Sequence, residues 1–273
     1  MKNLKNILLF IMFCYFSAYS NGYIPAEARW SYNKAMHEMF VGEDITYVVR
    51  YSVFKLGEVR LKILEQKDKN GHAYYKTKAY IDSYPGVPFV DLHQIYESMY
   101  DARGYSNFFR ATEKEKDYIK YTEYYFNYDK KRIHVKKGKY RPDEVWTDST
   151  AYAKTNYQDG LSLFYYARMN TGQKKSVDVP CFVTEEFVFT RINFHDKTEA
   201  IQSDAAGYKI PCSYLNGHTD FVSIFGLTGN FEGYFTNDIY AVPVLAKMKV
   251  IIGNVSLELK DWRIGNWKPP RFN

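Results

Sequence analysis

Apolar and polar side chains alternate with a period of two along much of the chain. Every odd position from Ile45 to Val53 carries an apolar or aromatic side chain. Successive side chains of a β-strand point to opposite faces, so this pattern is typical of a strand with one buried face. Residues 58–63 then alternate strictly between charged and apolar side chains. Together the two stretches predict a β-hairpin with one face in water.

Further strand-like stretches follow at intervals of about ten residues. They lie at residues 73–81, 92–100, 105–112, 118–127, 132–136 and 177–194, with an interruption expected at Pro180. Near the C-terminus, residues 244–252 and 255–259 alternate again and predict another hairpin. This regular spacing is typical of antiparallel strands joined by short turns.

One stretch departs from the period of two. Large side chains recur at helical spacing behind Asp159, a residue type that suits the start of a helix. We predict an amphipathic helix over residues 159–168 and a partly helical segment around residues 25–40. The predicted fold class is therefore all-β and mainly antiparallel, with a strongly curved, partly closed, barrel-like sheet and one or two helices packed at its open side.

The first 20 residues have the features of a secretory signal peptide. Two lysines precede an apolar run over residues 7–16, and the small side chains of Ala18 and Ser20 precede a cleavage site. The apolar run is too short to span a membrane stably. We expect residues 1–20 to be removed by cleavage near Ser20. Residues 21–273 are then a single β-rich domain, exported to the periplasm or outer envelope, with no transmembrane segment.

The charge of the chain argues against one class of partner. The chain has 37 Lys and Arg against 31 Asp and Glu, and removal of Lys2 and Lys5 with the signal peptide leaves 35 against 31, a formal net charge of +4. Basic and acidic side chains are interspersed, as in residues 113–117. Proteins that bind nucleic acid concentrate basic side chains in a patch or stripe. We therefore expect no nucleic acid partner.

Aromatic residues are abundant, with 27 Tyr, 19 Phe and 4 Trp. Aromatic side chains favour the half-buried surface of a sheet, so a large antiparallel sheet accounts for them. The alternative is a platform on which sugars or lipids stack. Tyr96 and Tyr100 share one face of a predicted strand, as do Tyr47 and Tyr51. These four tyrosines either pack in the core or, where they face a concave surface, bind a ligand.

Two cysteines, Cys181 and Cys212, remain after signal-peptide cleavage. The oxidising environment outside the cytoplasm permits one disulfide between them. Such a bridge would close a loop of about 30 residues and stabilise the fold by on the order of 3 kcal/mol. Whether it forms depends on a geometry that sequence spacing does not determine.

No motif for metal binding or catalysis stands out. The six histidines form no i, i+2 pair and no HExxH helix, and residues 218–220 are the nearest approach to a ligand cluster. A Gly-x-Ser-x-Gly elbow is also absent from the sequence. Glu97 with Asp101, and Glu185 with Glu186, offer the paired carboxylates that a glycosidase needs, although acidic side chains mostly face water. The sequence predicts no catalytic residue, no metal and no cofactor.

Several stretches occur in a characteristic order. They are the strand and hairpin at residues 47–64, residues 96–101, residues 159–168, and residues 236–244 with the hairpin at Gly253. In this order they resemble the bacterial exported family catalogued as domain of unknown function 3108. The resemblance spans most of residues 21–273 and implies an exported β-protein of the bacterial envelope, with no catalytic residue assigned. By analogy of fold, a half-open sheet with a helix is similar to periplasmic lipoprotein carriers, which favours binding over catalysis.

Three functional hypotheses follow from these observations. The first is a non-enzymatic protein that binds a lipid-like or glycan ligand, or an envelope protein, on a concave aromatic-rich β-surface. The second is a structural or assembly scaffold of the envelope, which would use a flat apolar patch or an unpaired edge strand. The third is a polysaccharide or peptidoglycan hydrolase that uses two convergent carboxylates, one of them with a raised pKa.

Overall fold

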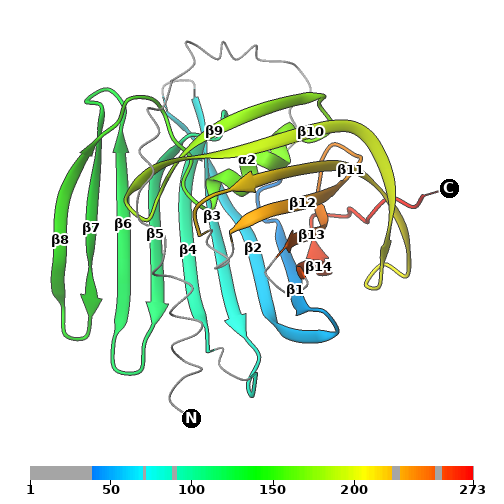
Figure 1. Ribbon diagram of the computed structural model, residues 1–273, viewed down its shortest axis with the longest axis horizontal. Helices are drawn as coiled ribbons and strands as arrows, with labels where there is room; N and C mark the ends of the chain where they lie inside the picture. Colours follow the sequence, from blue (N-terminus) through cyan, green and yellow to red (C-terminus); the bar gives the residue numbers. More distant parts are fainter. Residues whose placement is uncertain (1–38, 70–71, 88–90, 223–227, 250–253, 273) are drawn as a thin grey trace. The chain divides into compact units, whose positions relative to one another are not determined.

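The computed structural model describes residues 39–69, 72–87, 91–222, 228–249 and 254–272. The expected signal peptide and almost all of the segment expected to be helical around residues 25–40 lie outside the described residues. Within them, fourteen strands and one helix are present (Figure 1). The elements are β1 (Asp44–Tyr51), β2 (Phe54–Lys69), β3 (His72–Ser83), β4 (His93–Asp101), β5 (Ser106–Lys114), β6 (Ile119–Asn127), β7 (Arg132–Tyr140), β8 (Glu144–Tyr152), α2 (Ser162–Asn170), β9 (Lys175–Val183), β10 (Glu186–Ser203), β11 (Tyr208–Thr219), β12 (Gly229–Thr236), β13 (Pro243–Lys249) and β14 (Asn254–Arg263).

All fourteen strands belong to one sheet, in the order β8-β7-β6-β5-β4-β3-β2-β1-β14-β13-β12-β11-β10-β9. Strands that are neighbours in the sheet are antiparallel, including β1 and β14. The two edge strands, β8 and β9, follow each other in the chain and are joined through α2. The predicted fold class is confirmed, because the protein is one curved, unclosed, mainly antiparallel sheet with one helix beside it.

The sheet curls so that β9 reaches the region of β6. The ring of Phe182 on β9 lies 5.0 Å from the ring of Tyr124 on β6, measured between ring centroids. Figure 1 shows β9 to β12 crossing over the layer formed by β3 to β6, with α2 between them. The segment before α2 helps to bridge the opening, since the backbone nitrogen of Gln158 donates to the Pro180 carbonyl oxygen at 2.9 Å. The opening of the sheet is thus bridged by side chains and by this segment.

Two groups of buried side chains lie on opposite sides of α2. The larger core, built mainly on β1 to β7, includes Ile45, Leu61, Ala79, Tyr100, Phe109, Ile133, Leu161, Tyr165 and Met169. The smaller core, on β9 to β12, includes Tyr166, Ala167, Val179, Cys181, Ile192, Phe194, Leu215 and Phe235. The helix contributes to both cores, so it buries two faces against the two halves of the curled sheet.

Most predicted strands are confirmed, including the hairpin now seen as β13 and β14. The interruption expected at Pro180 is wrong, because β9 continues through it and turns at Thr184 and Glu185, which have φ angles of 52° and 63°. Pro180 is tolerated because β9 is an edge strand and proline lacks only the N–H that would point away from the sheet. Sequence analysis also missed β8, β11 and β12.

The disulfide that the sequence permits between Cys181 and Cys212 is not formed in the structure, since both thiols are free and buried. Cys181 on β9 lies opposite Val188 of β10, whereas Cys212 on β11 lies opposite Glu199 of β10. Eleven positions of a strand correspond to roughly 35 Å, whereas bridged cysteines have Cα atoms less than about 7 Å apart. Burial raises the pKa of both thiols to about 12, so neither has the thiolate character that makes cysteine reactive.

Candidate functional site

Asp159 fixes the start of α2 and confirms the predicted helix. Its Oδ1 atom accepts hydrogen bonds from the backbone nitrogens of Leu161 at 2.7 Å and Ser162 at 2.8 Å. Its Oδ2 atom accepts from the hydroxyls of Ser98 at 2.6 Å and Ser106 at 2.7 Å. Burial raises the pKa of this carboxyl, and the hydrogen bonds from the two serines oppose that rise. The helix is thereby tied to β4 and β5, which leaves its other side facing β10 to β14.

An apolar pocket of about 140 Å³ lies on that other side, between α2 and strands β10 to β14. The helix contributes Leu163, Phe164 and Ala167. The apolar side chains from the sheet side are Ile192, Leu215, Phe221, Phe231, Phe235, Pro243, Ala246, Met248 and Leu257. These residues define what we call the apolar pocket, which lies inside the curl of the sheet against the smaller core.

Two small residues lie in the sheet wall of the pocket. Gly233 on β12 and Ala246 on β13 are direct partners in the register. A Cβ atom on Gly233 would lie 2.8 Å from a ring carbon of Phe235 and 3.1 Å from the side chain of Leu215, so glycine is required for this close packing. The Leu215 and Phe235 side chains thus fill the space beside Gly233. Ala246, its partner on β13, has a small side chain and borders the pocket.

The polar groups around the apolar pocket are engaged elsewhere. The hydroxyl of Thr219 donates to the Phe221 carbonyl oxygen at 3.3 Å, and that of Thr190 lies 3.7 Å from the Cys181 sulfur. Glu232 and Lys247 also line the pocket, but they alternate with inward-facing residues and line a cavity on the outer face as well. The pocket thus presents hydrocarbon to a ligand and no reactive group.

A buried ion pair lies on the opposite side of α2. The guanidinium of Arg168 donates two hydrogen bonds to the Glu43 carboxylate, at 2.5 and 2.7 Å, and its Nε donates to the Tyr240 carbonyl oxygen at 2.9 Å. Arg168 is 1% and Glu43 0% exposed, measured on the side chains. A paired, bidentate arrangement is the form in which buried charges are tolerated. The pair ties α2 to the residues just before β1.

The predicted ligand-binding tyrosines are mostly part of the larger core. Tyr47, Tyr96 and Tyr100 are buried, and Tyr51 at the end of β1 is half-buried. Tyr100 stacks on Tyr165 of α2 with ring centroids 5.3 Å apart. Burial raises the pKa of the Tyr47 and Tyr100 hydroxyls well above the usual range. None of the four predicted residues lines the apolar pocket or the outer cavities described below.

The predicted carboxylate pairs are each engaged with cations. Glu97 pairs with Lys78 at 2.5 Å, and Asp101 with Arg103 at 2.6 Å. The Glu185 carboxylate accepts hydrogen bonds from the Tyr124 hydroxyl and the Lys137 ammonium, both at 2.6 Å. These carboxylates, and that of Glu186, line none of the three cavities.

Metal-ligand clusters and membrane-spanning helices are both absent from the described residues. No group of three or more His, Cys, Asp or Glu side chains there is placed to hold a metal ion. His218 instead contacts the Asn230 and Asp220 side chains, at 2.7 Å each. No helix in this part of the chain combines the length and apolar character needed to cross a membrane.

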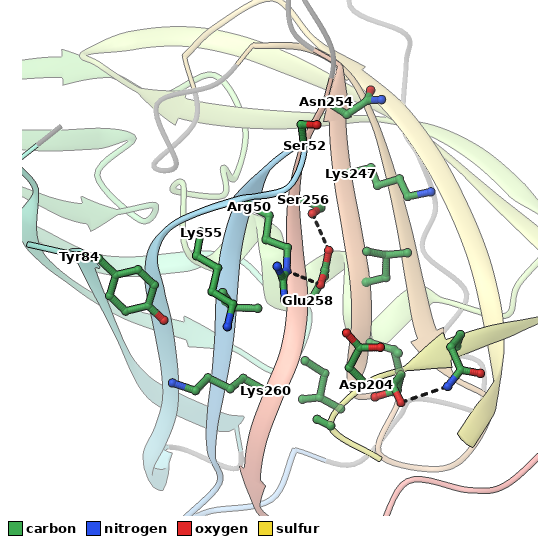
Figure 2. Close-up of a pocket in the computed structure, with 17 residues that line it drawn as sticks. Arg50, Ser52, Lys55, Tyr84, Asp204, Lys247, Asn254, Ser256, Glu258 and Lys260 are labelled. Atoms are coloured by element: carbon green, nitrogen blue, oxygen red, sulfur yellow. Dashed lines mark hydrogen bonds and ion pairs between the residues drawn. The ribbon is translucent and has the colours of Figure 1, made fainter. Parts of the chain in front are cut away.

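Two polar cavities lie on the outer face of the sheet. The first, of about 840 Å³, lies against β1, β2, β13 and β14 and is bordered by the turn between β10 and β11 (Figure 2). The second, of about 500 Å³, lies over β10 to β13. Lys247 and Asn254 line both, so the two cavities adjoin. We refer to them together as the outer trough.

Comparison with known proteins gives a family and a similar fold. The family model described as "Protein of unknown function (DUF3108)" matches residues 46–260. No curated protein matches the chain. Among solved structures, the chain is similar to a β-barrel-like protein of domain of unknown function DUF1849 from Brucella abortus. The two are 14% identical, the match covers 85% of this chain and 100% of that chain, and the TM-score is 0.47.

Proposed function

We propose, for this chain, which belongs to the DUF3108 family of proteins of unknown function, that it binds a lipid-like ligand without transforming it. One hydrocarbon segment of the ligand occupies the apolar pocket. The observation that supports this proposal is a pocket inside the curl of the sheet whose walls are almost entirely hydrocarbon. The proposed location, in the periplasm or outer envelope, rests on the sequence of residues 1–20 alone.

The size of the pocket limits what enters it. An apolar cavity of about 150 Å³ stays dry and takes a molecule as small as benzene. The apolar pocket, at about 140 Å³, therefore takes only one end of an acyl chain or a single ring. Each buried methylene contributes about 0.8 kcal/mol to binding. The remainder of the ligand, including any polar head, stays outside the pocket.

The lining favours binding over catalysis. A catalytic site needs a nucleophile, a base or a metal within reach of the ligand. The two threonine hydroxyls of the apolar pocket contact protein atoms, and the charged ends of Glu232 and Lys247 belong to the outer face. The paired carboxylates that a hydrolase would use lie away from all three cavities. A pocket that offers a ligand only hydrocarbon contacts suits a carrier or a sensor.

Filling the pocket tests the proposal. Ala246→Phe places a ring in the space opposite Gly233, and Ala200→Phe is the matched control because Ala200 is exposed on β10 and lines no cavity described above. We would titrate each protein with the fluorescent fatty acid 11-(dansylamino)undecanoic acid and compete it with palmitate. We expect Ala246→Phe to weaken probe binding by about tenfold, since that corresponds to about 1.4 kcal/mol, fewer than two buried methylenes.

Two controls distinguish loss of the pocket from loss of the fold. Overpacking costs typically 1–3 kcal/mol, so thermal unfolding is recorded for each variant, with Ala246→Leu as a milder replacement. The proposal fails if the unmodified protein does not bind the probe. It also fails if folded Ala246→Phe binds the probe as tightly as Ala200→Phe does.

A second candidate function, assembly through an edge strand, is favoured by β8. This strand is an edge of the sheet, and Val145, Trp146 and Tyr152 on it are 51%, 44% and 68% exposed. An exposed apolar edge is a template for pairing with another strand. A second copy of this chain, paired through β8, would form a symmetric dimer. Sedimentation of the protein against a Trp146→Lys variant tests this, and a concentration-independent monomer in both contradicts it.

A further inference from the structure

The outer trough lies on the face of the sheet opposite the larger core. On β1, Ile45 and Tyr47 point into that core, whereas Val48 and Arg50 line the first cavity of the trough. Phe231, Glu232 and Lys247 border both the trough and the apolar pocket, but Lys55, Asp204, Asn193 and Asn216 line the trough and not the pocket. The trough is therefore a separate site from the one proposed above.

Some of the charges in the first cavity are already compensated. Arg50 pairs with Glu258 at 2.8 Å, and Glu258 also accepts a hydrogen bond from the Ser256 hydroxyl at 2.9 Å. Lys260 pairs with Glu58, whose carboxylate also accepts a hydrogen bond from the Tyr84 hydroxyl at 2.5 Å. Figure 2 shows the Arg50, Ser256 and Glu258 side chains grouped on one wall of this cavity. These contacts fix the wall without involving a ligand.

Other charges in the first cavity are available. Within the described part of the chain, Lys55 and Lys247 make no ion pair with an acidic side chain. The nearest aromatic contact of Lys247 is the ring of Tyr234, 5.9 Å from its ammonium. Asp204, on the bordering turn, also makes no ion pair there. Two available cations and one available carboxylate suit a ligand that carries both negative groups and hydroxyls.

The second cavity continues the trough with neutral polar groups beside the charged side chains of Arg191, Glu232, Lys247 and Lys249. The side-chain amide of Asn193 donates to the Asn216 Oδ1 atom at 2.8 Å, and the side-chain amide of Asn216 donates to the Tyr214 hydroxyl at 3.2 Å. His218 and Asn230 contact each other at 2.7 Å across neighbouring strands. Amide, imidazole and phenol groups each offer donors and acceptors, which is what a row of sugar hydroxyls requires. The two adjoining cavities accommodate an extended ligand better than a compact one.

We propose that the outer trough binds an acidic oligosaccharide, a chain of sugars that carries carboxylate groups. Lys55 and Lys247 bind its carboxylates, while Asp204 and the amides of Asn193 and Asn216 bind its hydroxyls. A nucleic acid fits less well, because Asp204, Glu232 and Glu258 line the trough and would repel closely spaced phosphates. This site is additional to the one proposed for the lipid-like ligand. It would let one protein hold two envelope components on opposite faces of one sheet.

The test uses a defined acidic glycan and a neutral one. Isothermal titration calorimetry of the purified protein with hexagalacturonate is compared with cellohexaose, which lacks carboxylates. The double variant Lys55→Gln, Lys247→Gln is compared with Lys114→Gln, Lys116→Gln, which removes the same charge from exposed lysines in and beside the turn between β5 and β6. We expect the first pair to weaken hexagalacturonate binding about tenfold or more, since a hydrogen bond to a charged group contributes about 1.5–3 kcal/mol. The control pair should change it less than about twofold, because exposed distant charges are screened.

Several outcomes would overturn the proposal. Equal affinity for hexagalacturonate and cellohexaose would show that the lysines do not recognise carboxylates. Equal weakening by the two lysine pairs would assign binding to the general charge of the protein. Inorganic phosphate, or vesicles of phosphatidylglycerol, that bound more tightly than the glycan and through Lys55 and Lys247 would assign the trough to a phosphate or a lipid headgroup instead. Thermal unfolding checks that both double variants are folded.

Discussion

The two halves of the curled sheet differ in how completely side chains fill them. In the half formed by β1 to β7, rings stack in series, as in the pairs Tyr100 with Tyr165 and Phe109 with Tyr124, whose centroids are 5.3 and 5.4 Å apart. In the half formed by β9 to β13, the side chains leave the apolar pocket, whose sheet wall includes Gly233 and Ala246. Both halves are aromatic-rich, so aromatic content alone does not indicate the cavity.

The helix between the two halves reflects the same difference. Its Leu161, Tyr165 and Met169 are buried in the larger core, whereas Leu163 and Phe164, which line the apolar pocket, are only half-buried. One face of α2 is therefore committed to packing, and the other has surface left for a ligand. The predictions below ask whether the filled half supports the fold while the open half supports binding.

The largest effect is expected at the buried ion pair that holds α2 to the filled half. Arg168→Met leaves the Glu43 carboxylate buried without a counter-charge, and breaking a buried pair in this way costs about 3–5 kcal/mol. The double variant Glu43→Met, Arg168→Met removes both charges and should recover most of that loss, because apolar replacements of a buried pair are often neutral. Urea unfolding measures both free energies. Equal losses in the single and double variants would mean that the charge itself is not the cause.

The second prediction compares the two halves directly. Tyr100→Ala removes a fully buried ring, and large-to-small changes of this kind cost about 3–5 kcal/mol. Phe231→Ala truncates a half-buried ring at the wall of the apolar pocket and should cost only about 1–2 kcal/mol. Phe231→Ala should nevertheless change the affinity for the fatty acid probe, whereas Tyr100→Ala should not. Similar stability losses, or a probe response to Tyr100→Ala alone, would contradict the proposed division between the halves.

The fold was largely predictable because alternation is a local property. From Ile45 to Tyr51 every second residue is apolar or aromatic and lies buried or half-buried, whereas Val53 lies exposed in the turn after β1. Asp159 marks the helix start with its own side chain. The strand β8 was missed because its burial pattern has little alternation, with most residues exposed at the edge of the sheet. Pro180 was misjudged because whether a proline is tolerated depends on which strand becomes an edge, and this is decided by the complete sheet.

The candidate site was not predictable to the same degree. Tyr96 and Tyr100 share one face of a strand, but period two does not reveal whether that face meets a core or a cavity. The signal that was available lies in Gly233 and Ala246, small residues at inward positions, yet their juxtaposition requires the register of β12 with β13. The buried pair of Glu43 and Arg168 joins residues 125 positions apart, and nothing local indicates it.

The smallest predicted effect concerns a contact between the two halves of the sheet. The carboxylate of Glu185, in the turn between β9 and β10, accepts hydrogen bonds at 2.6 Å from Tyr124 on β6 and Lys137 on β7. Tyr124→Phe and Glu185→Gln should each cost about 1 kcal/mol, because the Glu185 side chain is 33% exposed and water screens its contacts. If Tyr124 and Glu185 act through each other, the double variant will lose less than the sum of the two singles, and urea unfolding of all four proteins gives the coupling energy. Additive losses would show that Tyr124 and Glu185 do not stabilise the fold through each other. A coupling of about 1 kcal/mol would instead show that this turn helps to hold the curled sheet together. If Glu185→Gln also changed the affinity for the fatty acid probe, the contact would affect the open half as well.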